Sequence, residues 1–244
     1  MLPAPHAAPV EQLRATLAVE QKRVQEPAGG HARRLYYARG VSGRARVGIA
    51  LVLALGAPAA ATASPERPDD LVDVAPLIPD AVLDIRYATT DNFTGQVLYP
   101  AATCKLRRAV AARLVKAATI LRKQQRRLLI WDCYRPSSIQ HVLWKLVPDP
   151  RYVADPKLGS KHNRGAAVDV AVVDQDGKPL PLPTKFDDFS KAAHRSRALL
   201  GTKGAEARRL AKAMRAAGFT GMPTEWWHFD APDSARYALS DEPL

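Results

Sequence analysis

Residues 160–169 limit what this 244-residue chain can fold into more than any other stretch. They read SKHNRGAAVD, which places His162 and Asp169 seven positions apart with small residues between them, and an apolar run follows. A second cluster, residues 225–228, reads EWWH and supplies another histidine and another carboxylate. Both clusters contain metal-ligand side chains. We therefore expect a fold that brings these two distant segments together around one metal ion.

Zinc chemistry suggests roles for the histidines and carboxylates of the two clusters. A catalytic zinc ion usually has three protein ligands and one open position, and His162, Asp169 and His228 form such a set, with one zinc per chain. The metal activates a water molecule and polarises the scissile carbonyl. Glu225 is the candidate general base that accepts the proton of that water. Arg135, just after a predicted strand, is the candidate donor to the developing oxyanion.

The spacing within the second cluster carries a prediction about the backbone. Residues 225 and 228 of a regular strand point to opposite faces. If both serve one zinc ion, the chain must bend at Glu225 and Trp226, and regular strand must begin only near Trp227. The alternatives are a structural histidine before a strand and a tryptophan pair that belongs to the core. The other histidines have no partners in the sequence and are interpreted as surface or structural residues: His6, His31, His141 and His194.

The formal charge of +12 does not by itself indicate a nucleic-acid ligand. Residues 1–63 contain eight Lys or Arg and three Asp or Glu, which is a net charge of +5 and leaves +7 for residues 64–244. The basic groups at 105–108 and 122–127 lie on one predicted amphipathic helix, so we interpret them as a solvated helix face. Attraction to an anionic surface, such as a membrane or cell wall, is the alternative. No nucleic-acid module is recognisable, so no nucleic-acid partner is expected.

The N-terminal segment resembles an export signal. Residues 47–63 are apolar, follow Arg44 and Arg46, and end in Ala-Thr-Ala, which predicts a signal peptide cleaved after Ala63. The run is broken by glycine and proline and is shorter than the roughly 20 residues that span a bilayer. We therefore expect an N-terminal extension and signal peptide at 1–63, a catalytic domain at 64–244 without a stable membrane span, and an exported location, periplasmic or extracellular. Retention of the segment as a membrane anchor, or translation that starts near Val41, are the alternatives.

Cys104 and Cys133 are the only two cysteines, and both lie in the expected mature domain. In an exported chain they can form one disulfide that closes a loop of about 30 residues and contributes about 3–4 kcal/mol. A metal-binding or nucleophilic thiol is less favoured, because no histidine lies at a suitable spacing. The sequence carries no prediction of an oligomeric state.

The pattern of apolar residues predicts a single α+β domain. Strands are expected at 82–87, 128–133, 167–173 and 227–230, and helices at 106–121, from a Ser137 cap to about 146, and at 205–217 before Gly218. Because these elements follow one another without a βαβ rhythm, we expect a mostly antiparallel central sheet flanked by helices, with the zinc site on the sheet.

Several motifs together resemble the D-alanyl-D-alanine dipeptidase family. They are SxHxxGxAxD at 160–169, EWWH at 225–228, YATTDNFTG at 87–95, YRP at 134–136 and FD at 186–187, so the likeness runs from about residue 70 to 230. The first motif is shared with zinc D,D-carboxypeptidases and peptidoglycan endopeptidases. The second and third motifs point to dipeptidases.

The resemblance implies a zinc enzyme that hydrolyses D-alanyl-D-alanine to two D-alanines in cell-wall peptide turnover. It implies the same ligands, base and oxyanion donor as above. It adds Ser160 and Asp187, where the family holds the free ammonium of the substrate, and Tyr87 in the same pocket. Pro183 stands in the loop where the family often has Met-Gly. A D,D-carboxypeptidase or endopeptidase acting on peptidoglycan stem peptides, and a wall-binding module that has kept the metal site, are the competing hypotheses.

Overall fold

A computed structural model describes residues 67–244 of the chain. These residues belong to one compact unit that spans Glu66–Leu244. The predicted N-terminal extension and signal peptide, with cleavage after Ala63, lie outside the described residues. Within residues 67–244, no helix is both long enough and apolar enough to cross a membrane.

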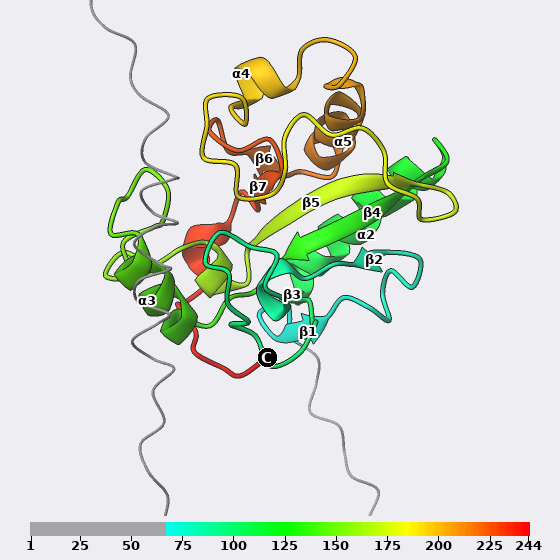
Figure 1. Cartoon of the computed structure of the whole chain (residues 1–244). Coiled ribbons are helices and arrows are strands. Elements are labelled where there is room, and N and C mark those ends of the chain that lie inside the picture. The colour runs from blue at the N-terminus through cyan, green and yellow to red at the C-terminus, as the bar shows by residue number, and fades with distance from the viewer. Residues whose placement is uncertain (1–66) are drawn as a thin grey trace, which may run out of the picture. The chain divides into compact units, whose positions relative to one another are not determined.

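A five-stranded sheet with the order β2-β4-β5-β7-β6 organises the domain (Figure 1). Three of its pairings are antiparallel, but β2 runs parallel to β4, so the sheet is mixed and the expected mostly antiparallel sheet is wrong. The reason is the connection, because the chain crosses over through a helix between β2 and β4, and such crossovers join parallel strands. The strands are β2 (Val82–Leu83), β4 (Arg126–Asp132), β5 (Ala167–Asp174), β6 (Thr220–Gly221) and β7 (His228–Asp230).

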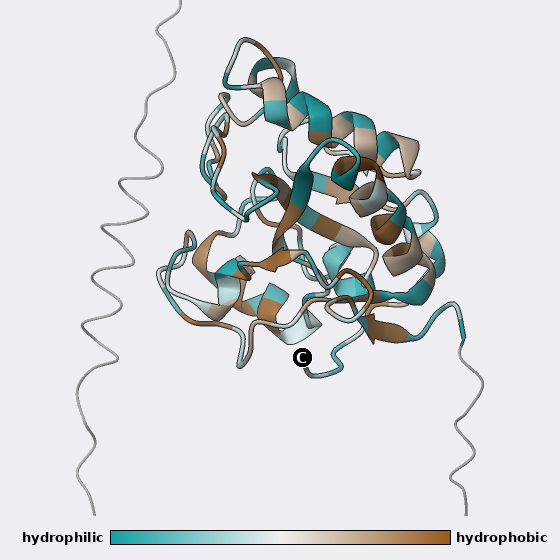
Figure 2. Ribbon diagram, turned by 90° about the vertical axis from the view of Figure 1, so that its right-hand side faces the viewer, coloured by the Kyte–Doolittle hydropathy of each residue, from teal (hydrophilic) through white to brown (hydrophobic). Residues whose placement is uncertain are grey.

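Strand β5 lies at the centre of this sheet, and every residue from Ala167 to Val173 is buried. Helices α2 (Arg108–Arg122) and α5 (Ala205–Ala216) pack against each other, α2 against β4 and α5 against β5. Both helices are amphipathic, and Figure 2 shows brown apolar and teal polar stretches along the helical ribbons. Burial on both faces explains why β5 reads as an almost continuous apolar run, in which Asp169 is the polar exception.

The starts of two predicted helices differ in the structure. Residues 105–107 form strand β3 (Lys105–Arg107), which pairs antiparallel with β1 (Leu71–Asp73), so the first long helix begins only at Arg108. Helix α3 (Ser137–Leu146) has the expected length, but the Ser137 side chain does not cap it. The C-terminal tail caps it instead, since the Ser137 amide donates to the Ser240 carbonyl at 3.0 Å and the Ser138 amide donates to Asp241 Oδ1 at 2.7 Å.

The predicted strand at 82–87 is also shorter in the structure. It ends at Leu83, and the chain then turns into a 3₁₀ helix, η1 (Arg86–Ala88), that buries Tyr87. The Tyr87 ring packs against three other rings, which stabilise this turn better than a continued strand would. The remaining elements are η2 (His162–Arg164), α4 (Arg195–Ala198) and η3 (Ser234–Arg236).

Cys104 and Cys133 form a disulfide with an S–S distance of 2.05 Å. It connects the segment before β3 to the residue that follows β4, so it lies beside the loop that carries Arg135.

Candidate metal centre and active site

Three side chains converge at one buried point. His162 Nε2 lies 3.2 Å from His228 Nδ1 and 3.4 Å from Asp169 Oδ2, and His228 Nδ1 lies 2.9 Å from Asp169 Oδ1. Ligand atoms of a tetrahedral zinc ion with bonds of about 2.0–2.1 Å lie about 3.3–3.4 Å apart. The donor set could therefore hold a metal ion, and its spacing is close to that of a zinc site.

Each of these three residues lies on a different element of the fold. Asp169 lies on β5 and faces His228, the first residue of β7, in the register of the two strands. His162 begins η2, which ends at Gly165 in the left-handed conformation with φ of 64°. A Cβ atom on Gly165 would lie 2.5 Å from Leu71 Cδ2, so only glycine allows this close approach to β1.

Each imidazole has a hydrogen-bond partner at its outer nitrogen, the ring nitrogen that points away from the other two ligand residues. His162 Nδ1 lies 2.6 Å from the Cys133 carbonyl oxygen, and His228 Nε2 lies 2.9 Å from Asp230 Oδ1. Both outer partners accept hydrogen bonds, so each outer nitrogen can donate its proton and leave the inner nitrogen to a metal ion. The inner nitrogens face the carboxylate of Asp169, and either a proton on His228 Nδ1 or a metal ion between the three groups balances the carboxylate charge.

The charges around His228 lead to the same conclusion. Burial lowers the pKa of His228, but its hydrogen bonds to Asp169 and Asp230 outweigh burial and raise that pKa to about 10. Burial raises the pKa of Asp169, but the two histidines outweigh it and hold that pKa well below its usual range. The cluster thus stabilises a positive charge, which a metal ion supplies in place of a proton.

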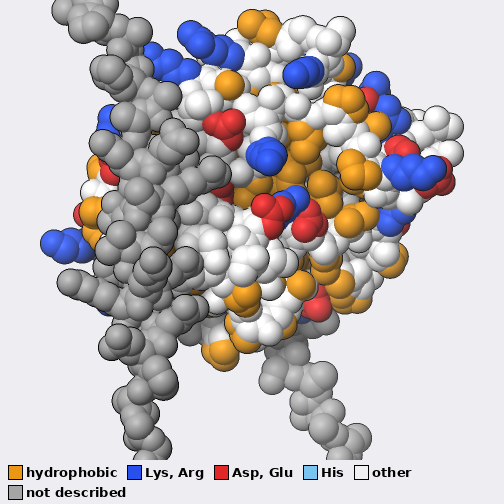
Figure 3. All heavy atoms as spheres, viewed as in Figure 1, with side chains coloured by type: hydrophobic (Ala, Val, Ile, Leu, Met, Phe, Trp, Pro, Cys, Tyr) orange, Lys and Arg blue, Asp and Glu red, His pale blue; other side chains and the backbone are white. Residues whose placement is uncertain are grey.

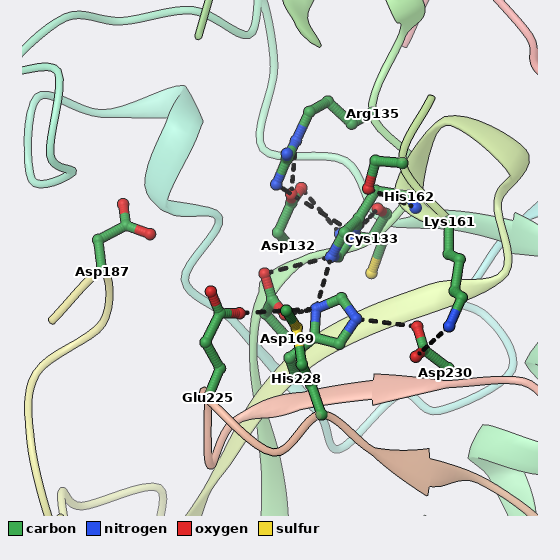
Figure 4. Close-up of polar contacts among 12 residues, drawn as sticks. Asp132, Cys133, Arg135, Lys161, His162, Asp169, Asp187, Glu225, His228 and Asp230 are labelled. Atoms are coloured by element: carbon green, nitrogen blue, oxygen red, sulfur yellow. Dashed lines mark hydrogen bonds and ion pairs between the residues drawn. The ribbon is translucent and has the colours of Figure 1, made fainter. Parts of the chain in front are cut away.

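Glu225 reaches the cluster because the backbone bends before β7. The strand begins at His228, and residues 226–227 are bends, as the spacing predicts. Figure 4 shows Glu225 and His228 projecting to the same side, and Glu225 Oε2 lies 3.9 Å from His228 Nδ1. Burial raises the pKa of Glu225, with a further contribution from Asp169.

Arg135 lies in a fixed, buried position. Its Nη2 donates to Asp132 Oδ2 at 2.6 Å, its Nη1 donates to Gln140 Oε1 at 3.0 Å, and its guanidinium lies 5.0 Å from the centre of the Tyr87 ring. Gln140 is itself fully buried and donates to the Ala154 carbonyl at 2.8 Å. After these contacts, Nη1 and Nη2 of Arg135 each retain one N–H.

The three residues assigned only by resemblance surround the same space. Asp187 Oδ2 accepts the Phe93 amide at 3.2 Å, and its Oδ1 lies 3.5 Å from the Tyr87 hydroxyl. Burial, together with the nearby carboxylates, raises the pKa of Asp187 well above its ordinary value. Figure 4 shows Asp187 set apart from the metal cluster, across from Glu225. Ser160 Oγ accepts the amide of His162 at 3.2 Å.

One cavity of about 90 Å³ is lined by the three candidate metal ligands, by Glu225 and Arg135, and by the three residues assigned by resemblance. Figure 3 shows that hydrophobic side chains gather near the centre of the face seen in Figure 1, with acidic and basic side chains beside them. The residues predicted from the sequence that line the cavity are Tyr87, Arg135, Ser160, His162, Asp169, Asp187, Glu225 and His228. The cavity is small, so it suits a compact ligand with both charged and apolar parts.

The sequence did not predict the residues that support the site without lining the cavity. Asp230 orients His228, and Lys161 Nζ pairs with Asp230 Oδ2 at 2.7 Å. Asp132 and Gln140 fix Arg135. Asp230 could have been found from the sequence, because it stands two residues after His228 and so shares its face of the strand.

Comparison with known proteins identifies the family. A family model described as D-ala-D-ala dipeptidase matches residues 67–242. The D-alanyl-D-alanine dipeptidase of Escherichia coli (strain K12) is 37% identical over 171 residues, which cover 70% of this chain and 89% of that protein. The D-alanyl-D-alanine dipeptidase of Enterococcus faecium is 30% identical over 188 residues, covering 66% and 86%. That of Streptomyces coelicolor is 30% identical over 196 residues, covering 71% and 93%. The chain therefore belongs to the D-ala-D-ala dipeptidase family of metallopeptidases.

Proposed function

We propose that this chain is an exported zinc D,D-dipeptidase that hydrolyses D-alanyl-D-alanine to two D-alanines and takes one zinc ion per chain. The observation that carries the proposal is the convergence of His162, Asp169 and His228, whose ligand atoms lie 2.9–3.4 Å apart beside a buried glutamate. Family membership and relatives named D-alanyl-D-alanine dipeptidase support the substrate.

His162, Asp169 and His228 are the residues that would hold zinc. When bound, zinc lowers the pKa of a water molecule and polarises a carbonyl group. The outer partners of the two histidines fix the rings so that the inner nitrogens are directed at the metal position.

Glu225 performs the proton transfers in this proposal. Its carboxylate accepts a proton from the attacking water and later donates it to the amine that leaves when the peptide bond breaks. Its buried position, which raises its pKa, makes it a better proton acceptor than an exposed glutamate. It also stands next to the three ligands, where the reacting water must lie.

Arg135 stabilises the oxyanion that forms on the scissile carbonyl. Its guanidinium is fixed by Asp132 and Gln140 before any substrate arrives, so little reorganisation is needed in the transition state. The two N–H groups that remain on Nη1 and Nη2 are the donors to the oxyanion.

Asp187 binds the free ammonium of the dipeptide, with Ser160 and Tyr87 in the same cavity. A buried carboxylate with a raised pKa lacks a full positive partner, and an ammonium group supplies one. This need for a free amine separates a dipeptidase from a carboxypeptidase, whose substrates are acylated at that nitrogen.

Export and a role in cell-wall peptide turnover complete the proposal. The apolar segment at 47–63 and its Ala-Thr-Ala end support a signal peptide. The disulfide between Cys104 and Cys133 supports an oxidising compartment, because such bonds are rare in reducing cytosol.

The experiment compares D-alanyl-D-alanine with its N-acetylated form on the same zinc-loaded protein. We expect the free dipeptide to be cleaved with the higher kcat/KM, because only it offers an ammonium group to Asp187. The Asp187→Asn variant should lose most of this preference. Faster cleavage of the acetylated compound would instead identify a D,D-carboxypeptidase.

A further inference from the structure

Arg195 is a half-buried arginine outside the cavity. It is the first residue of α4, and within residues 67–244 no carboxylate lies at ion-pair distance from it, although the charge of Asp230 acts on it. Burial lowers its pKa to about 10, so it keeps its charge at neutral pH. A partly buried charge with no direct ion pair needs compensating contacts.

The compensating contacts all lie on the segment that carries Glu225. Arg195 Nε donates to the Met222 carbonyl and Nη2 donates to the His228 carbonyl, each at 2.9 Å. The Arg195 amide donates to the Pro223 carbonyl at 2.9 Å. The guanidinium also lies 4.2 Å from the centre of the Phe229 ring. One side chain thus joins both ends of the bend between β6 and β7.

Other contacts hold the middle of the bend. The buried rings of Trp226 and Trp227 pack against Trp131, the Val170 amide donates to the Trp227 carbonyl at 3.0 Å, and Trp226 Nε1 donates to Thr184 Oγ1 at 2.9 Å. Arg195 joins the two ends of the bend. The Met222 amide donates to the His228 carbonyl at 3.1 Å and closes the hairpin, and the Trp226 amide donates to the Ala193 carbonyl at 3.1 Å. Ala193 and Arg195 are neighbours in sequence, so the same short segment holds the bend at its middle and at both ends. Only a planar guanidinium can bridge two carbonyls and stack on a ring at once.

Gly221 has no side chain, and the Arg195 guanidinium occupies the space that a side chain would need. A Cβ atom at residue 221 would lie 2.2–2.4 Å from three atoms of the Arg195 guanidinium. The guanidinium therefore fills the space where any other side chain would begin. Glycine at this position leaves that space to Arg195.

We infer that Arg195 is a positioning residue that holds the bend at 222–228 so that Glu225 and His228 face the same metal position. This inference rests on the proposed function, because Arg195 affects catalysis only if Glu225 is the general base. Arg195 itself does not line the cavity.

The test measures kcat per bound zinc for D-alanyl-D-alanine in the full chain carrying Arg195→Ala. We expect kcat to fall about 100-fold, since misplacement of a catalytic group by about 1 Å has that effect. KM should change by less than about twofold, because the cavity groups remain. Ethylguanidinium in the buffer should restore part of the lost rate, and Arg195→Lys should keep less activity than the rescued variant. Arg197→Ala, on the exposed side of the same turn, is the matched control and should behave as wild type.

Gly221→Ala tests the same contact without removing the arginine. Its Cβ should displace the guanidinium and lower kcat to a similar extent, and adding it to Arg195→Ala should cost little more. Backbone amide exchange in peptide 222–228 gives a readout that needs no activity, and it should quicken in both variants but not in Arg197→Ala. Unchanged exchange, wild-type kcat per zinc in Arg195→Ala, or no rescue by ethylguanidinium would each overturn the inference. If the wild-type protein does not cleave D-alanyl-D-alanine, the proposed function fails, and the exchange experiment alone decides the role of Arg195.

Discussion

At the scale of single residues, the metal centre depends on the groups behind the two imidazoles. The outer nitrogen of His162 meets a neutral backbone carbonyl, whereas that of His228 meets the carboxylate of Asp230. Lys161 in turn neutralises part of the charge on Asp230. A carboxylate behind a histidine raises its basicity and fixes its ring, so Asp230 should strengthen metal binding more than the carbonyl does.

The Asp230→Asn variant tests this role. An asparagine cannot offer two negatively charged oxygens to His228 and Lys161, so we expect the zinc dissociation constant to rise about 10- to 100-fold. Competition with a chromogenic chelator measures it. The matched control is Asp176→Asn, at an exposed turn, which should bind zinc as wild type does. Lys161→Met should have a smaller effect than Asp230→Asn, since the Lys161 side chain is 50% exposed. Equal affinity in Asp230→Asn and wild type would contradict the assignment.

The sequence identifies the groups that face the metal better than the groups that support them. His162, Asp169, His228 and Glu225 are chemically distinctive residues in short motifs, so their convergence could be predicted. The carbonyl of Cys133 could not, because a backbone oxygen has no signature in sequence. The role of Arg195 could not be predicted for a related reason, because its partners are backbone carbonyls of a bend that is distant in sequence.

At the scale of secondary-structure elements, predictions succeeded where one physical pattern dominated. Strand β5 is apolar because both of its faces are covered, and the spacing of Glu225 and His228 required the bend before β7. The strand predicted at 82–87 failed because the ring packing of Tyr87 outweighed its alternating pattern.

Helix α3 shows how an element can depend on a remote segment. Its first amides are satisfied by the C-terminal tail, and Asp241 accepts the Ser138 amide at 2.7 Å. This hydrogen bond lowers the pKa of Asp241. Because α3 also carries Gln140, which fixes Arg135, the tail supports the active site indirectly.

The Asp241→Ala variant should lower the free energy of unfolding by about 1 kcal/mol, as the loss of a helix cap does. Chemical denaturation measures the change. Asp241→Asn keeps a side-chain oxygen for the Ser138 amide and should retain most of the stability. If the two variants are equally destabilised, the charge rather than the hydrogen bond is what matters. If neither is, the tail does not stabilise α3.

At the scale of the whole domain, the α+β class could be predicted from the order of elements, but the sheet topology could not. Val82–Leu83 is too short to reveal its partner, and only the crossover through α2 determines that it joins β4 in parallel. The disulfide could be predicted because the chain has two cysteines and an export-like N-terminus.

Removing the disulfide should destabilise the domain as a whole. The two cysteines are 29 residues apart, and a loop of that size corresponds to about 3–4 kcal/mol in the chain-entropy model. We expect the double variant Cys104→Ala, Cys133→Ala to lose about this much unfolding free energy. Wild-type protein kept under reductant should unfold at the same denaturant concentration as the variant. A variant as stable as oxidised wild type would show that the bond contributes little.

The proposed function requires one zinc ion, held by His162, Asp169 and His228, for the cleavage of D-alanyl-D-alanine. The most direct measurement is D-alanine release by the metal-depleted full chain as zinc is added back stepwise. We expect no D-alanine release before zinc is added, and then a linear rise in the rate of release that ends at one equivalent of zinc. Glu225→Gln should show no such rise, although that variant binds the same amount of zinc. D-alanine release by metal-free protein, or an unchanged titration in His228→Ala, would contradict this requirement for zinc.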